Sequence, residues 1–331
     1  MRVAINGFGR IGRGFFKSAF PHKEIEIVAI NDLTDTKTLA HLLKYDSVHG
    51  KFLDDISYTD NQLIVAGKKI PVYSIKEVDK LPWKDLDVDI VIESTGLFLD
   101  KQSAEKHLQA GAKKVLLSAP AKSEGIKTIV MGVNDSLLNK DDLIVSNASC
   151  TTNCAAPMIK VVLKFGIESG YVSTVHAYTA DQRLHDAPHK DLRRARAAAV
   201  NIVPTSTGAA KAVTKIFPEL SGKLGGCGIR VPVSDGSLTD ITLFVKNPPK
   251  NADEVNDLFK KYADGELKGI MQYSDEPLVS SDIVGNPHSV IFDSEFTSVI
   301  GNMIKLIGWY DNEWGYSNRL VDLSKKMYSL K

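Results

Sequence analysis

This sequence has no excess of charge of either sign, few cysteines and no long apolar run. The 41 basic and 40 acidic residues nearly cancel, so the composition favours neither a dedicated nucleic-acid site nor a membrane surface. Three cysteines in 331 residues make no disulfide framework, which favours a reducing, cytoplasmic setting. No apolar stretch approaches the roughly 20 residues of a membrane span. Because the N-terminus runs directly into a motif, we also expect no signal peptide.

A glycine-rich turn follows the first apolar strand. Residues 3–5 lead to Asn-Gly-Phe-Gly-Arg-Ile-Gly-Arg at 6–13, and then to a segment with helical apolar spacing. Gly7 permits the tight turn, Gly9 lets the backbone approach a pyrophosphate, and Gly12 lets helix and strand pack closely. The pattern predicts a dinucleotide-binding turn.

An acidic residue follows the next strand at the spacing that this motif requires. The apolar run 25–30 ends at Asp32, about 20 residues after the last glycine. A carboxylate there hydrogen-bonds the adenosine ribose hydroxyls and repels a 2′-phosphate, so NAD is favoured over NADP. The alternative is an ordinary glycine turn, but the order of strand, motif, helix, strand and acidic residue argues against it.

Further apolar runs alternate with helix-length segments and predict a mostly parallel, doubly wound sheet. The expected strands are 89–92, 114–117, 128–133 and 143–145. Ligands bind outside the carboxyl ends of such strands. The sequence places three polar turns there, which are 93–96 with Thr95, 118–120 with Ser118, and 146–150. The first two fit ordinary turn chemistry equally well.

Beyond residue 150 the pattern changes to alternating strands such as Ser237–Val245. It predicts a second domain of α+β type with a mostly antiparallel sheet. The full fold class is therefore α/β, a Rossmann doubly wound parallel sheet plus an α+β catalytic domain. We expect an NAD-binding domain at 1–148 with 313–331, and a catalytic domain at 149–312.

A cysteine lies at the turn from the strand 143–145 into a buried helix. Cys150 is flanked by hydroxyl residues where unpaired N–H groups and the helix dipole stabilise a thiolate, so it is a candidate nucleophile. The alternative is a small buried hydrophobe. The candidate base is His176, at the end of the apolar strand 171–175, although a structural histidine fits there too. We expect no metal, because Cys150 and Cys154 lack a second ligand pair.

Two further segments carry groups suited to anions. The charged run 181–196 contains Arg193, Arg194 and Arg196, and it is either a solvated or subunit-contact face or a phosphate site. Residues 204–208 open a helix with hydroxyl groups and a glycine, which can bind phosphate or simply cap the helix.

Six motifs, in order along the chain, resemble those of the phosphorylating glyceraldehyde-3-phosphate dehydrogenases over essentially the whole length. They are Asn-Gly-Phe-Gly-Arg-Ile-Gly-Arg (6–13), Lys-Tyr-Asp-Ser-Val-His-Gly (44–50), Ser-Cys-Thr-Thr-Asn-Cys-Ala-Ala-Pro (149–157), His-Lys-Asp-Leu-Arg-Arg-Ala-Arg (189–196), Pro-Thr-Ser-Thr-Gly-Ala-Ala-Lys (204–211) and Trp-Tyr-Asp-Asn-Glu-Trp-Gly-Tyr-Ser (309–317).

This resemblance implies roles for individual residues. Cys150 would carry the acyl group, with His176 as its partner. The implied cofactor contacts are Arg10, Ile11, Asp32, Lys76, Ser118 and Asn312. The implied ligands of the substrate phosphate and of inorganic phosphate are Ser149, Thr151, Thr179, Arg194, Thr207, Gly208 and Arg230. A homotetramer is implied as well, in which the loop around 178–200 meets a neighbour's cofactor site.

The implied reaction is the oxidation of glyceraldehyde 3-phosphate to 1,3-bisphosphoglycerate with reduction of NAD, through a thiohemiacetal and a thioester on Cys150. The alternatives are an erythrose-4-phosphate dehydrogenase that hydrolyses the thioester, a cofactor-free Cys/His hydrolase, and an additional RNA- or host-binding role. Two positions depart from the family pattern. Ala180 replaces an Asn that contacts the nicotinamide side, and Ala187 stands where strictly NAD-dependent relatives often carry Leu. We therefore predict NAD preference with some use of NADP.

Overall fold

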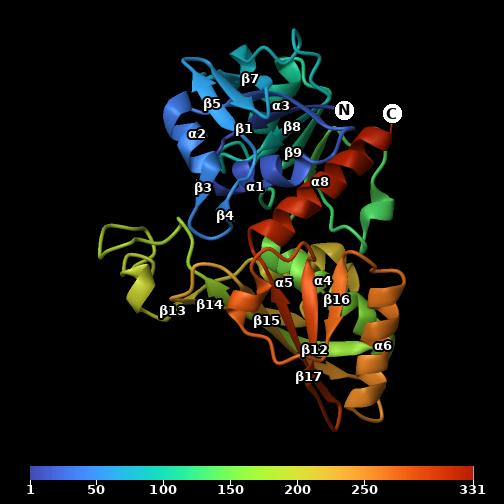
Figure 1. Ribbon diagram of the computed structural model, residues 1–331. Coiled ribbons are helices and arrows are strands. Elements are labelled where there is room, and N and C mark those ends of the chain that lie inside the picture. The colour runs from blue at the N-terminus through green and yellow to red at the C-terminus, as the bar shows by residue number, and fades with distance from the viewer. Residues whose placement is uncertain (331) are drawn as a thin grey trace. The chain divides into compact units, whose positions relative to one another are not determined.

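A computed structural model provides the structure, which describes residues 1–330 (Figure 1). The chain divides into two compact units. The first unit comprises Met1–Ile129, Asp135–Ala148 and the segment from Ser317 onward, and the second comprises Val130–Asn134 and Ser149–Tyr316.

The first unit is built on a nine-stranded sheet in the order β10-β11-β9-β8-β1-β2-β7-β6-β5. The strands from β10 to β7 pair in parallel, and β6 and β5 add antiparallel pairs at one edge. The predicted doubly wound parallel sheet is confirmed. Its strands are β1 (Arg2–Asn6), β2 (Glu26–Asn31), β5 (Ile56–Thr59), β6 (Gln62–Val65), β7 (Lys68–Tyr73), β8 (Ile90–Glu93), β9 (Lys114–Leu117), β10 (Lys127–Thr128) and β11 (Ile144–Ser146).

Strand β1 lies where the order of the sheet reverses, because it pairs with β2 on one side and with β8 on the other. Such a reversal is where doubly wound sheets bind their ligands. The helices of this unit are α1 (Arg10–Ala19), α2 (Thr36–Lys44), α3 (Lys101–Gln109) and most of α8 (Trp314–Ser329). A small hairpin of β3 (Tyr45–Asp46) and β4 (Gly50–Lys51) and the 3-10 turns Val78–Lys80 and Asp135–Leu137 complete the unit.

One predicted strand is shorter than expected. The run 128–133 is strand only at its start, because the chain turns at Gly132, whose φ is +78°. The N–H groups of Val133 and Asn134 both donate to the carbonyl of Val130 and close this turn. Apolar residues alone predicted a longer strand, but the left-handed glycine ends it.

The second unit contains a seven-stranded sheet in the order β13-β14-β12-β15-β18-β17-β16. Only the pairs β12–β14 and β16–β17 are parallel, so the predicted mostly antiparallel sheet is confirmed. Its strands are β12 (Ile167–Ala177), β13 (Val203–Thr205), β14 (Leu224–Val231), β15 (Ser237–Val245), β16 (Met271–Ser274), β17 (Val290–Ile300) and β18 (Met303–Tyr310).

Helices α4 (Cys150–Val162), α5 (Ala209–Ile216) and α6 (Ala252–Asp264) pack against this second sheet, and α7 (Ser280–Ile283) is a single turn. Short 3-10 turns lie at Leu163–Phe165, Ala198–Val200 and Pro218–Leu220. Helix α4 is buried along almost its whole length and continues past Pro157 to Val162. Several apolar side chains of the sheet remain exposed, namely Tyr171, Phe244, Phe296 and Ile300.

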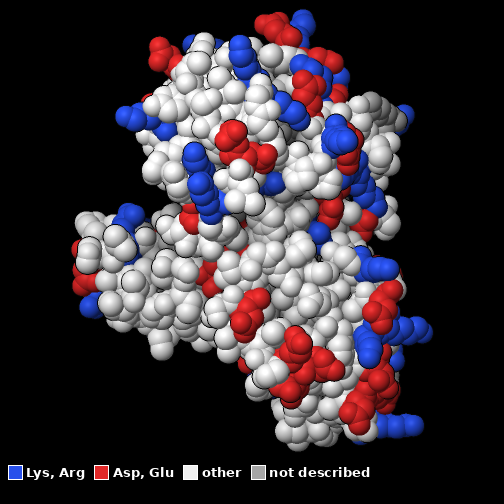
Figure 2. Space-filling view, in the orientation of Figure 1, with Lys and Arg blue, Asp and Glu red and all other residues white. Residues whose placement is uncertain are grey.

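Both signs of charge are spread over the visible face of the molecule (Figure 2), as the near-zero net charge predicts. Within residues 1–330, no helix is both long and apolar enough to cross a membrane.

Asp46 joins α1 to the β3–β4 hairpin. Its carboxylate pairs with Arg10 at 2.9 Å and with Lys17 at 3.2 Å, and it accepts the N–H groups of Val48 and His49 at 2.9 and 3.1 Å. Burial alone would raise the pKa of Asp46, but the N–H groups of Val48 and His49 and the Arg10 guanidinium hold it well below its usual range.

We expect Asp46→Asn to lower the free energy of unfolding at pH 7 by about 3 kcal/mol, because it leaves the buried Lys17 ammonium without its carboxylate. A depressed pKa contributes stability above the ordinary aspartate value and loses it in acid, so the difference should shrink below about pH 4. Urea unfolding at pH 7 and pH 3, at fixed protein concentration, measures both effects. Asp87→Asn, which breaks an exposed pair with Lys113, is the control and should change stability by less than about 0.5 kcal/mol. Equal losses in the two variants would contradict this role of Asp46.

Candidate functional site

The glycine turn of the first unit leaves the start of α1 open. Gly7 has φ +91°, and a Cβ there would lie 2.7 Å from the Thr95 nitrogen. A Cβ on Gly12 would lie 2.2 Å from the Gly7 carbonyl oxygen, so both glycines are required by packing. A Cβ on Gly9 would meet nothing within 4 Å, and no side chain caps α1. The turn therefore presents the first N–H groups of a helix to an anion, as a dinucleotide pyrophosphate requires.

Asp32 stands beside this turn at the end of β2. Its carboxylate accepts the N–H of Phe8 at 2.7 Å and that of Thr34 at 2.9 Å. These two bonds hold a half-buried acceptor next to the glycine turn, where the ribose hydroxyls of a dinucleotide are bound in sheets of this type. The residues present therefore fit NAD.

The other predicted cofactor residues of the first unit surround the same strand ends. Arg10 and Ile11 lie in the first turn of α1, and Lys76 is exposed three residues after β7. Thr95 follows β8, and Ser118 follows β9, where its N–H donates to the Glu93 carbonyl at 2.9 Å. Asn312 belongs to the second unit, where its side-chain oxygen accepts the Ser237 hydroxyl at 2.6 Å.

Cys150 and His176 are brought together in the second unit. Ser149 caps α4 by accepting the Thr152 N–H at 3.1 Å, so the helix begins at Cys150. The Cys150 Sγ lies 3.4 Å from His176 Nε2, and His176 is buried near the end of β12. The pair has the geometry of a thiol nucleophile with its base.

Arg230 contacts the far side of the same imidazole. Strand β14 pairs with β12 so that Arg230 lies opposite His176. The Arg230 Nη1 is 2.5 Å from His176 Nδ1, which is itself 2.7 Å from the carbonyl oxygen of Ala177. The carbonyl favours a proton on Nδ1, which leaves Nε2 as a base, whereas the guanidinium favours a bare Nδ1 and a proton on Nε2. The imidazole can therefore serve Cys150 either as acceptor or as donor.

Burial and the Arg230 charge set the protonation of this pair. Burial lowers the pKa of His176 to about 3, and the neighbouring guanidinium acts in the same direction. Burial raises the pKa of the Cys150 thiol, although Arg230 and the hydrogen bonds of Thr151 oppose this. The resting pair is thus a thiol and a neutral imidazole. It differs from the thiolate expected from the helix terminus, because desolvation outweighs the favourable charges.

Three predicted phosphate ligands lie around the start of α4 and the end of β12. The Ser149 hydroxyl is 2.8 Å from that of Thr152, and the Thr151 hydroxyl is 3.0 Å from that of Tyr310. Thr179 follows the end of β12, and its carbonyl accepts the Gln182 N–H. Ser149 and Thr151 directly flank the nucleophile in sequence, and the hydroxyls of both already have protein partners.

The remaining predicted phosphate ligands lie on the loop and turn that precede α5. The Arg194 Nε is 3.1 Å from the carboxylate of Asp181, and Nη1 is 3.5 Å from that of Asp191. Thr207 accepts the Ala209 N–H at 3.2 Å, and a Cβ on Gly208 would meet nothing within 4 Å. The open start of α5 and the paired Arg194 are compatible with an anion that would replace Asp181 as the partner of the guanidinium.

Tyr310 is a site residue that sequence reasoning missed. Its buried hydroxyl lies 3.0 Å from that of Thr151 and 2.8 Å from that of Thr174. Thr174 donates its hydroxyl proton to the Leu238 carbonyl at 3.2 Å, so its oxygen accepts the hydroxyl of Tyr310. Tyr310 in turn accepts the hydroxyl of Thr151. The ring also packs edge-on against His176. The motif at 309–317 contained this tyrosine, but only strand alternation hinted that it points inward.

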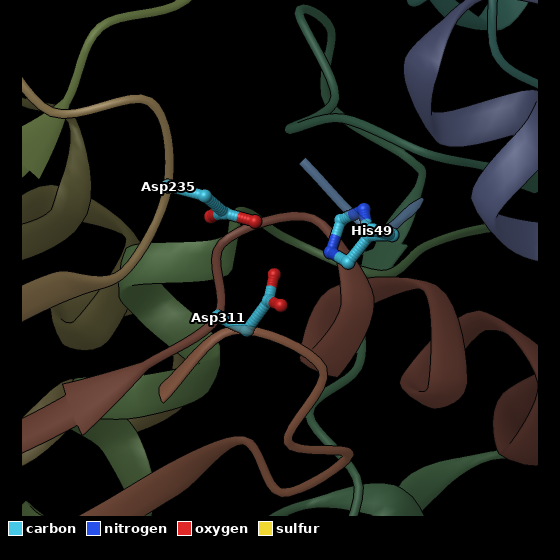
Figure 3. A group of neighbouring side chains, drawn as sticks. All are labelled: His49, Asp235 and Asp311. Atoms are coloured by element: carbon cyan, nitrogen blue, oxygen red, sulfur yellow. The ribbon is translucent and has the colours of Figure 1, made fainter. Parts of the chain in front are cut away.

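Two buried aspartates of the second unit point toward one another in Figure 3. Asp311 accepts the N–H groups of Gly285, Glu313 and Trp314 at 2.7, 2.9 and 2.6 Å, and so it holds the start of α8. Asp235 accepts the Gly236 N–H at 2.8 Å, and its charge adds to the rise in the Cys150 pKa. His49, the third side chain that the figure labels, belongs to the first unit.

Two family models match the chain. The glyceraldehyde 3-phosphate dehydrogenase NAD binding domain matches residues 1–101, and the C-terminal domain of the same enzyme matches residues 149–312. The matched NAD binding domain confirms the predicted cofactor.

Relatives named glyceraldehyde-3-phosphate dehydrogenase are similar over nearly the full length. The protein of Thermotoga maritima is 60% identical over 325 residues, which cover 97% of each chain. That of Streptomyces coelicolor is 57% identical over 329 residues, and that of Mycobacterium avium 56% over 331, each covering 98% of this chain and 97% of the relative. These matches confirm the resemblance carried by the six motifs.

We expect Arg230→Gln to slow the alkylation of Cys150 by iodoacetamide severalfold at neutral pH. The guanidinium lowers the pKa of the thiol, so its removal raises that pKa and leaves less thiolate to react. The pH dependence of the alkylation rate should move to higher pH. Arg196→Gln, which breaks an exposed pair with Asp186, is the control and should leave the profile in place. A profile of Arg230→Gln identical to that of the unaltered chain would exclude the guanidinium as a determinant of thiol reactivity.

Proposed function

The chain belongs to the glyceraldehyde-3-phosphate dehydrogenase family, and we propose that it oxidises glyceraldehyde 3-phosphate to 1,3-bisphosphoglycerate with reduction of NAD. The observation that carries the proposal is the 3.4 Å contact between Cys150 Sγ and His176 Nε2 at the start of a helix. We assign NAD binding to residues 1–148 with 313–331 and the covalent chemistry to 149–312.

In the first step Cys150 adds to the aldehyde carbon. The sulfur–carbon bond forms, the thiol proton passes to His176 Nε2, and the carbonyl electron pair moves onto oxygen. The imidazolium then returns that proton to the oxygen, and the first N–H groups of α4, which have no partner within the helix, can stabilise the developing charge. The product is a thiohemiacetal on Cys150.

The glycine turn, Asp32, Thr95 and Ser118 would hold NAD. When bound, NAD supplies the hydride acceptor that converts the thiohemiacetal to a thioester. His176 takes the hydroxyl proton during this conversion, for which the neutral imidazole of the resting pair is suited.

A thioester remains electrophilic enough for inorganic phosphate to displace it. The new oxygen–carbon bond forms while the carbon–sulfur bond breaks, and Cys150 recovers its proton from His176. We assign the two anion positions to Ser149, Thr151, Thr179, Arg194, Thr207, Gly208 and Arg230. One position anchors the C3 phosphate of the substrate and the other orients the attacking phosphate.

We further propose that the protein acts in the cytoplasm as a homotetramer. Apolar side chains gather on the loop that follows β12, where Leu184 is 74% exposed, Leu192 82% and Val200 76%. Exposed apolar side chains on one loop fit a contact between subunits.

The proposed reaction predicts NADH formation that depends on glyceraldehyde 3-phosphate and on added phosphate. Steady-state rates should be measured with both nicotinamides and with erythrose 4-phosphate as the second aldose. We expect kcat/KM for NAD to exceed that for NADP, with some NADP turnover because of Ala180 and Ala187. Cys150→Ser should abolish turnover while NAD still binds. NADH formation from erythrose 4-phosphate without any phosphate requirement would instead identify the hydrolytic relative.

The proposed tetramer predicts that Leu184→Asp combined with Leu192→Asp lowers the molar mass of the particle in light scattering, because buried charges oppose association. Leu53→Asp places a charge on another exposed leucine, in the first unit, and should leave the mass unchanged. A monomeric mass for the unaltered chain would refute the tetramer.

A further inference from the structure

A fully buried carboxylate lies beneath the cofactor turns of the first unit. Glu93, at the end of β8, has no exposed surface. One of its oxygens accepts Asn6 Nδ2 at 2.6 Å and His107 Nε2 at 3.0 Å, and the other accepts the N–H of Thr95 at 2.8 Å and the Thr95 hydroxyl. Among residues 1–330, no lysine or arginine forms an ion pair with it. Its charge is therefore held by hydrogen-bond donors alone, at a desolvation cost that an apolar residue would avoid.

The donor that faces Glu93 from α3 is fixed in one tautomer. His107 and Trp83 are both fully buried, and the Trp83 Nε1 lies 3.0 Å from His107 Nδ1. An indole nitrogen can only donate, so Nδ1 must accept and carries no proton. Nε2 therefore bears the proton that His107 gives to Glu93, and the imidazole is neutral.

The same chain of bonds continues to the neighbouring strands. The Asn6 side-chain oxygen accepts Asn31 Nδ2 at 2.7 Å, and the Asn31 oxygen accepts the Ile75 N–H at 2.9 Å. Each amide has one possible orientation, because the carboxylate at one end only accepts and the main-chain N–H at the other only donates. Trp83, His107, Glu93, Asn6 and Asn31 form what we call the polar ladder.

Three members of the polar ladder, Asn6, Asn31 and Glu93, adjoin or bind a residue that would touch NAD, and so does Ile75, which donates to Asn31. Asn6 precedes Gly7, Asn31 precedes Asp32, Ile75 precedes Lys76, and Glu93 holds Thr95. The Gly7 N–H also donates to the Asn31 carbonyl at 2.8 Å, and a Cβ on Gly7 would lie 2.7 Å from the Thr95 nitrogen, so the two turns lie close together. A shift of Glu93 therefore displaces turns at the ends of β8, β1 and β2 together.

We propose that the polar ladder positions the NAD-binding turns, and that His107 is a positioning residue for NAD affinity although it lies on α3 beneath them. The inference rests on NAD binding by the first unit. Without the proton on His107 Nε2, Glu93 loses one of its donors, the buried charge draws in water or rotates, and Thr95 and Asn6 move with it.

The test compares three variants of the full-length protein by calorimetric titration with NAD and by steady-state kinetics. His107→Leu removes both bonds of the imidazole and should raise the Kd and KM for NAD at least about tenfold, while kcat at saturating NAD falls less than about twofold. His107→Gln can still accept from Trp83 and donate to Glu93, and it should restore affinity to within about threefold. Val88→Ala removes methyl groups from the apolar cluster that contains Trp83 but removes no hydrogen bond of the ladder, and its Kd should stay unchanged.

Equal affinities of His107→Leu and the unaltered chain would overturn the inference, as would equal losses in His107→Leu and Val88→Ala. If His107→Leu does not fold, Trp83→Phe removes the indole donor while keeping an aromatic ring at this buried position, and it should still weaken NAD binding about threefold. An unchanged Kd in that variant also overturns the proposal. Failure of the unaltered chain to bind NAD would refute the proposed function itself.

Discussion

The chemistry of the second unit depends on how the chain enters α4. Ala148 has φ +57°, a left-handed conformation that costs a residue with a Cβ about 1 kcal/mol. Its N–H donates to the Ser146 hydroxyl at 3.1 Å, and the next residue, Ser149, caps the helix. The strained turn and the cap together make Cys150 the first helical residue. A start one residue later would place Thr151 there and move the sulfur away from His176.

The two units bury charge in opposite ways. Glu93 is an anion surrounded by donors that belong to neutral groups, so it fixes positions without needing a cation. Arg230 is a cation that contacts an imidazole and a carbonyl, and burial lowers its pKa. Its remaining donors are available to an anion, as the planar guanidinium of a phosphate ligand requires. The charge of Glu93 holds neighbouring turns in position, whereas the charge of Arg230 acts directly on the reacting groups.

Local spacing was enough to predict where the glycine turn, Asp32 and Cys150 lie in the fold, because each position is defined by residues close in sequence. The polar ladder could not be predicted in this way. His107 meets Glu93 across 14 residues and Trp83 across 24, and Tyr310 meets Thr151 across 159. The sequence alone does not show that His107 is buried or which groups it contacts. The raised pKa of Cys150 was not predicted either. The sequence shows that the cysteine begins a helix, but it does not show that the thiol is buried.

Arg230 lowers the pKa of both Cys150 and His176, so its charge favours a thiolate and disfavours an imidazolium. The two effects oppose one another for the transfer of a proton from sulfur to nitrogen. The guanidinium therefore does not drive that transfer in the resting pair. An anion bound to Arg230 would offset its charge at both groups, whereas the oxyanion formed at the aldehyde gives the new Nε2–H an acceptor and so favours the transfer. Proton transfer is then favoured when substrate is present, and the free thiol stays protected from reaction in its absence.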